Sequence, residues 1–581
     1  MKRVLHVAAL VFSQFACAVP PAPPAAQPDA LLKPAVEQGP NWTRGTRAQF
    51  YSGDQGSRII PLRWIMALKQ ANGQPFMADN LSRYGYLRND EAPSSLPVGF
   101  TTNGPDGNAA IGMTCAACHT REIEVGGKPY RIDGGPAIAD FQSFLMDIDQ
   151  AVNKVLSDPA VFADFAAAVL GGEPSPDAAR LLRIAISTWY GPYHTIMAGS
   201  LPNPGWGPAR LDAVGMIFNR LAGLDIGPAA ENYIIAANIS RADTPVRYPF
   251  LWNSGIQDAT QWPGFAVNGN ELFALARNTG EVLGVFAQFH PKTDPTKIGF
   301  GIDYSSDNSS NTEGLMKLSD LANNIGPPKF QWAYDAALAE RGKTIYQWPT
   351  AQGGCADCHG IKTSIDRLTG NVTWRTPILD VGTDTREYEL LKRQVTTGVL
   401  SGAGIPFLGK PLKPTDTAFN LLKVVVVGTI LQRLETVDRL VMANDEGSIP
   451  ALLSPASLHR RAEALVNGFH LATDSGNANA YEARVLQGIW AVAPYLHNGS
   501  VPTLADLLNP AMERPKAFKI GPAYDPTGKV GLAVEQTRFD YTLTTTGCEN
   551  RGSGASVCGH EYGTSLAPEN KRALLEYLKT L

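Results

Sequence analysis

Residues 115–119 read Cys-Ala-Ala-Cys-His and residues 355–359 read Cys-Ala-Asp-Cys-His, so the chain carries the same five-residue pattern twice. In a C-x-x-C-H pattern, two thiols add to the vinyl groups of a haem and the adjacent imidazole becomes the proximal iron ligand. The alternative is a redox pair or a zinc knuckle, but the knuckle would need further ligand pairs that the sequence lacks. We therefore expect two covalently bound haem c groups. The attaching and iron-binding residues would be Cys115, Cys118, His119, Cys355, Cys358 and His359.

The N-terminus and the remaining cysteines indicate an oxidising compartment. Residues 1–18 start with two basic residues, continue with an apolar stretch and end in Ala-Cys-Ala, which is typical of a cleaved signal peptide. A lipoprotein anchor at Cys17 is an alternative that the preceding residues fit poorly. Cys548 and Cys558 are then left over, and a disulfide is their expected state in such a compartment. The sequence predicts a periplasmic or secreted protein.

Charge and hydropathy exclude two classes of partner. The formal net charge is −4 and the isoelectric point is near 6.2, without a basic stripe, so nucleic acid is not an expected partner. The longest apolar run beyond the N-terminus, residues 424–431, is far too short to cross a bilayer, so stable membrane insertion is not expected. The 56 glycines and 43 prolines, beside 44% hydrophobic residues, favour a loop-rich folded scaffold over a disordered chain.

The local patterns predict a mainly α fold in which long, loop-rich connections join two c-type cytochrome haem domains. The expected helices lie at residues 137–155, 178–187, 332–346 and 568–581, and Gly126-Gly127 marks a turn. A Pro/Ala-rich leader at 19–40 is expected to lack regular structure. The expected units are an N-terminal haem c domain at 41–240, a connecting segment at 241–326 and a C-terminal haem c domain at 327–581.

The second axial ligand of each haem decides between electron transfer and chemistry at the iron. The histidines outside the two patterns and the signal peptide are His194, His290, His459, His470, His497 and His560. His560 is the best candidate at the second haem, because it follows Cys558 in a loop just before the final helix. His497 is the alternative ligand, or a residue at the haem edge, and Met442 and Met512 are more remote options. The first haem has no comparably placed partner, which predicts an open site for dioxygen or peroxide.

Five further stretches carry a resemblance to a known family. Residues 250–253 (FLWN) and 488–500 (GIWAVAPYLHNGS), together with the two haem patterns, resemble the bacterial di-haem cytochrome c peroxidase superfamily. Residues 111–114 (IGMT), 130–136 (YRIDGGP) and 559–563 (GHEYG) are most similar to the di-haem rubber oxygenases and related di-haem fatty-acid dioxygenases. The resemblance covers most of the mature chain.

This resemblance implies roles for three residues. Trp252 matches the tryptophan that lies between the two haems and relays electrons, although a core tryptophan at a domain junction is an alternative. His560 matches the distal ligand of the second haem in the rubber oxygenases. Phe265 lies near the place where those enzymes have a phenylalanine over the open haem, and an ordinary core phenylalanine is the other interpretation.

The stretch after Trp252 separates the enzymes of this superfamily. Its peroxidases supply a Glu soon after this tryptophan, because peroxide cleavage needs a group that moves a proton between the two oxygens. Here Asp258 is the only acid among the next twelve residues, Glu271 follows later, and residues 262–265 are apolar. An apolar distal wall suits dioxygen and a hydrophobic alkene. We therefore expect a dioxygenase that adds dioxygen to a C=C bond of polyisoprene rubber or an unsaturated fatty acid.

In the expected dioxygenase the first haem performs the chemistry and the second tunes its redox state. A di-haem peroxidase is the alternative; it would use a redox partner protein, and Asp258 or Glu271 would have to reach its pocket. A plain electron-transfer cytochrome is a further alternative, and it would require both haems to be six-coordinate.

Overall fold

The structure is a computed structural model, and it describes residues 35–91, 96–105, 108–297, 300–366, 369–405, 408–433, 455–469 and 478–581. Helices account for 39% of the structure and strands for 15%. The fold is therefore mixed α/β, and the prediction of a mainly α fold is wrong. Apart from one three-stranded sheet, every sheet in these ranges has two strands. Many of the strands are two or three residues long, and no alternation of apolar and polar residues can be read over so short a stretch.

The N-terminal part contains three long helices, three shorter helices and several short strands. Its elements are α2 (Arg44–Ser52), β1 (Ile60–Pro61), α3 (Leu62–Ala67), β2 (Phe100–Asn103), β3 (Ala110–Met113), α4 (Cys115–Cys118), β4 (Thr120–Val125), β5 (Lys128–Asp133), α5 (Phe141–Ser157), α6 (Pro159–Leu170) and α7 (Pro176–Ser200). The helix expected at 137–155 is α5; it starts at Phe141 because the Asp140 carboxylate caps it through the Ser143 amide, 3.0 Å away. The helix expected at 178–187 lies inside α7.

The end of the predicted leader is packed. The Val36 amide donates to the Arg131 carbonyl at 3.1 Å, and the Gln38 side-chain amide donates to the Asp133 carbonyl at 2.7 Å. Residues 35–40 therefore lie against β5 although they form no helix or strand beyond a bridge between Ala35 and Arg131, and the predicted extent of the leader stays a prediction. The predicted signal peptide and the rest of the leader lie outside the described residues.

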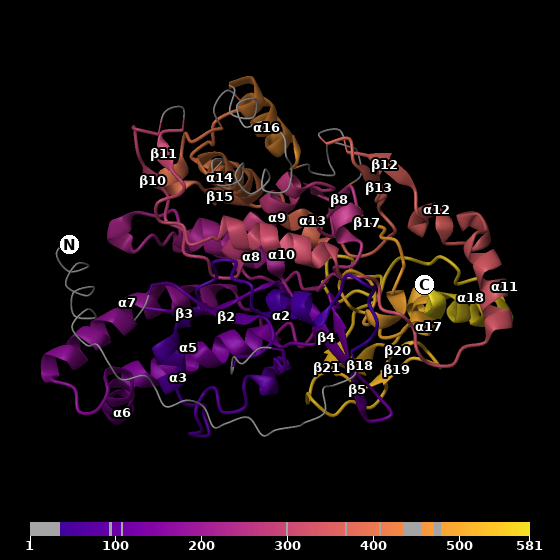
Figure 1. Cartoon of the computed structure of the whole chain (residues 1–581), viewed down its shortest axis with the longest axis horizontal. Helices are drawn as coiled ribbons and strands as arrows, with labels where there is room; N and C mark the ends of the chain where they lie inside the picture. Colours follow the sequence, from indigo (N-terminus) through magenta and orange to yellow (C-terminus); the bar gives the residue numbers. More distant parts are fainter. Residues whose placement is uncertain are drawn as a thin grey trace.

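The hairpin that follows the first haem pattern joins the N-terminal part to the C-terminal part. Gly126 and Gly127 form its two-residue turn with φ of 57° and 76°, the left-handed conformation that such a turn requires. Ile123 and Ile132 of this hairpin share one hydrophobic cluster with Trp490. Figure 1 shows β4 and β5, in indigo, beside the yellow C-terminal elements. The hairpin after the first haem pattern therefore shares a core with the C-terminal part, and the predicted domain boundaries stay a prediction.

The middle of the chain contains more helix than expected. Its elements are β6 (Arg210–Leu211), α8 (Ala213–Leu224), β7 (Val246–Arg247), β8 (Ala259–Thr260), β9 (Ala266–Val267), α9 (Glu271–Gly284), β10 (Lys292–Thr293), β11 (Ile302–Asp303) and α10 (Thr312–Asn323). Asn270 caps α9 through the Phe273 amide at 2.9 Å, and Asn311 caps α10 through the Gly314 amide at 3.0 Å. The segment expected to be a mere connection thus provides two capped helices.

The C-terminal part carries the second haem pattern. Its elements are α11 (Ala336–Tyr346), α12 (Ala356–His359), β12 (Thr363–Ile365), β13 (Val372–Trp374), β14 (Ile378–Leu379), α13 (Arg386–Leu390), β15 (Gln394–Thr396), β16 (Thr415–Thr417), α14 (Ala418–Gln432), α16 (Pro455–Asn467), β17 (Tyr481–Glu482), α17 (Leu504–Leu507), β18 (Ala517–Lys519), β19 (Tyr524–Asp525), β20 (Gly531–Leu532), β21 (Thr542–Thr544) and α18 (Pro568–Thr580). The helices expected at 332–346 and 568–581 are α11 and α18, which pack against each other. Asp335 caps α11 and thereby sets its start at Ala336.

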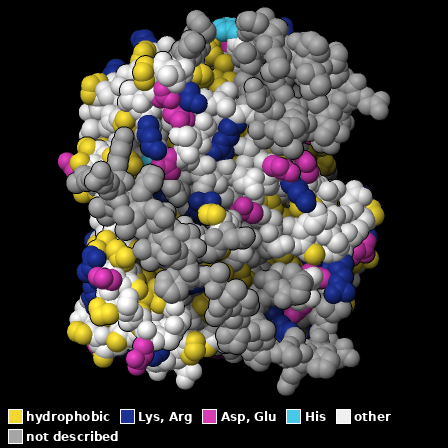
Figure 2. Space-filling model, turned by 60° about the vertical axis from the view of Figure 1, so that its left-hand side comes forward, with side chains coloured by type: hydrophobic (Ala, Val, Ile, Leu, Met, Phe, Trp, Pro, Cys, Tyr) yellow, Lys and Arg dark blue, Asp and Glu magenta, His cyan; other side chains and the backbone are white. Residues whose placement is uncertain are grey.

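The long apolar run is a core helix. Residues 424–431 lie in α14, and nearly all of its side chains are buried in one hydrophobic cluster with α8 and α9. Among the described residues, no helix combines the length and the hydropathy needed to cross a membrane. Basic and acidic side chains are interspersed on the face drawn in Figure 2, which shows no continuous basic stripe.

Candidate haem sites

The first haem pattern lies at the wall of a cavity. Cys115, Cys118 and His119 all line this cavity. Nδ1 of His119 lies 2.9 Å from the Pro249 carbonyl oxygen and donates a hydrogen bond to it, which leaves Nε2 as the lone-pair nitrogen. Burial lowers the pKa of His119 to about 4, so the imidazole is neutral at physiological pH. These features fit a proximal haem ligand.

The second haem pattern repeats this arrangement. Cys355, Cys358 and His359 line a second cavity, and Nδ1 of His359 donates to the Arg484 carbonyl oxygen at 2.7 Å. Burial lowers the pKa of His359 as well. In both patterns the bond that orients the imidazole comes from a residue more than a hundred positions away, so the sequence motif alone did not reveal it.

His560 faces His359 across the second cavity. The ring centroids are 6.0 Å apart and the rings are inclined by 46°. Two imidazoles that share one iron reach about this separation, because each nitrogen–metal bond is about 2 Å long and the nitrogens face inward. The Nδ1 atom of His560 is buried without a hydrogen-bond partner among the described residues. Burial also lowers the pKa of His560 to about 3, so it is neutral. The donor set and the spacing fit a haem between the two rings.

The loop that carries His560 is held from three sides. The amide of His560 donates to the Val381 carbonyl at 2.8 Å. Gly559 has a φ of 79°, and a Cβ there would come within 2.3 Å of the Gly382 backbone, so only glycine fits this contact. The buried Arg514 guanidinium donates to the carbonyls of Gly559 at 2.8 Å and His560 at 3.2 Å. These contacts fix the loop opposite His359.

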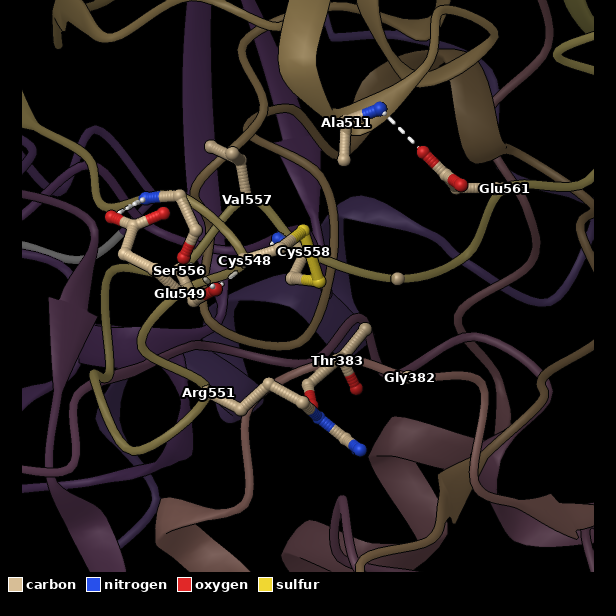
Figure 3. The surroundings of a disulfide bond; sticks show 12 residues. Gly382, Thr383, Ala511, Cys548, Glu549, Arg551, Ser556, Val557, Cys558 and Glu561 are labelled. Carbon is tan, nitrogen blue, oxygen red and sulfur yellow. Dashed lines mark hydrogen bonds between the residues drawn. A yellow bond between two sulfur atoms is a disulfide. The ribbon is translucent and has the colours of Figure 1, made fainter.

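The expected disulfide between Cys548 and Cys558 is confirmed. Figure 3 shows this bridge beside residues 382–383, where Nε of Arg551 donates to the Thr383 carbonyl at 2.8 Å. The bridge closes a loop that ends two residues before His560. It therefore anchors the candidate ligand from the N-terminal side.

The disulfide gives a testable prediction. Thiol labelling of the denatured, unreduced mature protein should leave Cys548 and Cys558 unmodified, and labelling after reduction should modify both. Replacing both by Ser should lower the free energy of unfolding by roughly 2 to 3 kcal/mol, because a short loop is no longer closed in the unfolded chain. Efficient labelling of both residues without reductant would contradict the bridge.

His497, the alternative ligand, lies at the wall of the second cavity. Its Nε2 is 2.9 Å from Oδ2 of Asp384, and its ring stacks on Tyr481 with centroids 3.9 Å apart. The imidazole is thus engaged by a carboxylate and does not face His359 as His560 does. This placement fits the interpretation of His497 as a residue at the haem edge.

The remaining candidate ligands lie elsewhere or outside the described residues. His194 pairs with Asp149 near the surface at 3.0 Å, and His290 lies 3.4 Å from Asp307. Met512 is 86% exposed. His459 is an exposed residue of α16, while His470 and Met442 lie outside the described residues. Among the residues that the structure describes, the first cavity is therefore lined by one imidazole, that of His119.

The first cavity has only part of the expected apolar wall. Trp262 lines it, but Phe265 does not; Phe265 packs in the core against Phe419, with ring centroids 5.5 Å apart. Polar side chains line much of this cavity: Gln261, Asn268, Asn270, Glu271, Arg277, Asn278 and Glu281. Residues 262–265 do not form one wall, because the loop turns the Phe265 side chain away from the cavity and into the core.

One face of α9 supplies two residues that the sequence analysis missed. Glu271, Ala274, Arg277 and Glu281 line the first cavity at the three- and four-residue spacing of one helix face. Oε1 of Glu281 accepts from the Gln261 amide at 2.6 Å and lies 3.9 Å from Nε of Arg277. Burial raises the pKa of Glu281. The spacing of these residues is visible in the sequence, but only the tertiary structure shows that this face of α9 lines the cavity.

The two carboxyl groups considered in the sequence analysis differ in position. Glu271 lines the first cavity, at the start of α9. Asp258 does not line it among the described residues, and its Oδ1 accepts from the Thr376 amide at 2.7 Å. Of the two, only Glu271 is at the first haem site.

Trp252 lines neither cavity among the described residues. It is fully buried, its Nε1 donates to the Gln487 carbonyl at 2.7 Å, and its ring stacks on Phe250 at 4.8 Å between centroids. Phe250 lines both cavities, and so does Trp262. The predicted relay position is thus one aromatic contact away from each haem site.

Comparisons with known proteins agree with a cytochrome. The uncharacterized protein y4iJ of Sinorhizobium fredii is 29% identical over 612 residues, which cover 93% of this chain and 92% of that protein. The uncharacterized protein y4iM of the same organism is 39% identical over 349 residues, or 57% of this chain and 63% of that protein. Residues 480–519, which contain Arg484 and His497, match the family described as RoxA-like, cytochrome c-like. Over this segment of 40 residues the chain is similar to RoxA-like, cytochrome c-like proteins.

Proposed function

We propose that the chain binds two haem c groups covalently, with different coordination. The first would be bound through Cys115, Cys118 and His119, and the second through Cys355, Cys358, His359 and His560. The observation that carries this proposal is the contrast between two facing imidazoles in one cavity and a single imidazole in the other. Held by His359 and His560, the second haem would supply electron transfer; held by His119 alone among the described histidines, the first would supply chemistry on a reactant.

We propose further that this protein is a dioxygenase acting on a C=C bond of a hydrophobic substrate, either polyisoprene or an unsaturated fatty acid. An open haem supplies dioxygen binding and redox chemistry when it is bound. The match to a RoxA-like family supports this proposal. The first cavity, about 390 Å³, is also larger than the second, about 170 Å³, which favours it as the place for a substrate.

The residues of the chain have defined tasks in this proposal. The Pro249 carbonyl keeps His119 in one tautomer and increases its basicity as a ligand. Trp262 and Phe250 exclude water from the space between the haem sites. Trp252, stacked on Phe250, would relay electrons between them. Phe265 has no task at the haem because it lies in the core.

A di-haem peroxidase is the second candidate, and a specific observation favours it. Glu281 lies in the wall of the first cavity, with its raised pKa and with Gln261 and Arg277 beside it. A carboxyl group in this position could move the proton that peroxide cleavage requires. Such an enzyme would receive electrons from a redox partner protein.

Product analysis under labelled dioxygen tests the proposal. The purified protein should consume dioxygen in the presence of polyisoprene or oleate and should insert both labelled oxygen atoms into product, without added peroxide. Peroxide turnover with a reduced cytochrome donor, combined with no dioxygen uptake on either substrate, would establish the peroxidase instead. A protein without activity in either assay and with two low-spin haems would be an electron-transfer cytochrome.

We also propose a location in the periplasm or outside the cell. Covalent haem c and the disulfide between Cys548 and Cys558 both fit an oxidising compartment. N-terminal sequencing of the mature protein from its native host tests this location, and cleavage after Ala18 is expected.

A further inference from the structure

Two buried arginines lie where the two cavities meet. Arg247 is 5% exposed and Arg484 is 6% exposed, and both line the first and the second cavity. Each guanidinium lies over an aromatic ring that is also shared: Arg247 is 4.8 Å from the Trp262 centroid, and Arg484 is 4.0 Å from the Phe250 centroid. The pair therefore has a rigid, desolvated setting between the two haem sites.

Arg484 uses only part of its hydrogen-bonding capacity within the protein. Its Nε and Nη2 donate to Oε1 of Gln257 at 3.0 and 2.7 Å. The nearest carboxylate oxygen, Oε1 of Glu482, is 4.0 Å from Nε, beyond hydrogen-bond distance. No bond from its Nη1 to another described residue is formed. This edge of the guanidinium is available in the cavities.

The Arg247 guanidinium donates its hydrogen bonds only to backbone carbonyls among the described residues. Its Nε donates to the Leu496 carbonyl at 2.9 Å and its Nη1 to the Tyr248 carbonyl at 3.4 Å, so its described hydrogen-bond acceptors are neutral. The buried Glu482 carboxyl, which also lines both cavities, acts on Arg247 through its charge. Burial, together with the charge of Arg484, lowers the pKa of Arg247 to about 9. Among the described residues, Glu482 is thus the one carboxyl group whose charge acts on both arginines, and it leaves an excess of buried positive charge. Such an excess is costly, and a ligand that brings a carboxylate removes the cost.

We infer that Arg247 and Arg484 form one carboxylate-binding site that takes propionate groups from both haems, an inference that rests on the two proposed cofactors. A planar guanidinium binds a carboxylate through two parallel hydrogen bonds, and the unused donors of both residues suit that geometry. Because one pair of cations contacts both cavities, its charge acts on both irons at once. The site thereby couples the redox potentials of the two haems.

Redox titration of each haem, followed by its own spectral signature, tests this inference. The Arg247→Gln and Arg484→Gln variants should each lower the midpoint potentials of both haems, because a nearby cation opposes the added positive charge of the oxidised iron. The Arg484 carbonyl that orients His359 is unchanged by this substitution. Arg277→Gln is the matched control: Arg277 lines only the first cavity, so the potential of the first haem alone should change.

Lys variants keep the charge but lose the two-pronged geometry, and they serve if a Gln variant fails to fold. Arg247→Lys should hold both potentials closer to wild type than Arg247→Gln does. A shift of one haem only, or of neither, in the Arg247 and Arg484 variants would overturn the shared site. A fatty-acid substrate could supply the same carboxylate: unchanged potentials combined with loss of an oleate-induced spectral change would assign the site to substrate. Purified protein without covalent haem would instead refute the proposed cofactors.

Discussion

The His560→Ala variant is expected to retain both haems while the second haem changes from low spin to high spin. His560 faces His359 at 6.0 Å between ring centroids, and loss of its imidazole removes the sixth ligand. Optical and electron paramagnetic resonance spectra of the oxidised protein measure this change. The signal of the first haem, which has no contact with His560, should stay as in the wild type. Added free imidazole should restore the low-spin signal.

His497→Ala is the matched control for this experiment. His497 lines the same cavity, but its imidazole is engaged by Asp384 and Tyr481. We expect the second haem to remain low spin in this variant, with at most a shift in its potential. Conversion to high spin in His497→Ala but not in His560→Ala would assign the distal position to His497.

The Glu281→Gln variant is expected to lower any peroxide turnover by about 10²- to 10⁴-fold, the usual contribution of a positioned acid–base group. The amide cannot accept a proton, while it keeps the size of the carboxyl group and a bond to Gln261. Dioxygen insertion into a hydrophobic substrate should be far less affected, because it does not need this proton transfer. Rates with peroxide and with dioxygen, measured on the same preparation, provide the comparison.

The pH profile gives an independent readout. Burial raises the pKa of Glu281, so the carboxylate becomes protonated, and unable to accept a proton, at a higher pH than an ordinary Glu. Peroxide turnover of the wild type should therefore fall off on the acidic side above the usual carboxyl range. This acidic limb should be missing in Glu281→Gln. Asp258→Asn is the control, since Asp258 is outside the cavity wall; loss of turnover in that variant alone would contradict the role of Glu281.

The position of Glu281 also changes how the chain is compared with peroxidases. In the sequence, the stretch soon after Trp252 lacks the Glu expected of a peroxidase and is apolar at residues 262–265. In the structure, the loop after Trp252 leads Phe265 into the core, and α9 brings Glu281 to the haem site from a later part of the chain. Distance along the chain from Trp252 was therefore a poor guide to which side chains line the first cavity.

Secondary structure was likewise predictable only where local sequence signals decide it. The caps at Asp140 and Asp335 are local signals, and the helices that they start were predicted with small errors at their beginnings. The small sheets were not predicted, because a strand of two residues forms only where another part of the chain pairs with it. Their number turned the expected mainly α fold into a mixed one.

The sequence by itself contains the two C-x-x-C-H patterns, which predict covalent haem attachment, and the pair of cysteines whose disulfide the structure contains. A haem c attachment pattern must be contiguous, since both thiols and the imidazole reach one porphyrin from a single turn of chain. The carbonyls that orient His119 and His359, the face of α9 and the shared pair Arg247 and Arg484 came only from the tertiary structure. These groups act through hydrogen bonds and charge, which depend on distance in space. Such interactions place no constraint on the sequence between the interacting residues, so no local pattern reveals them.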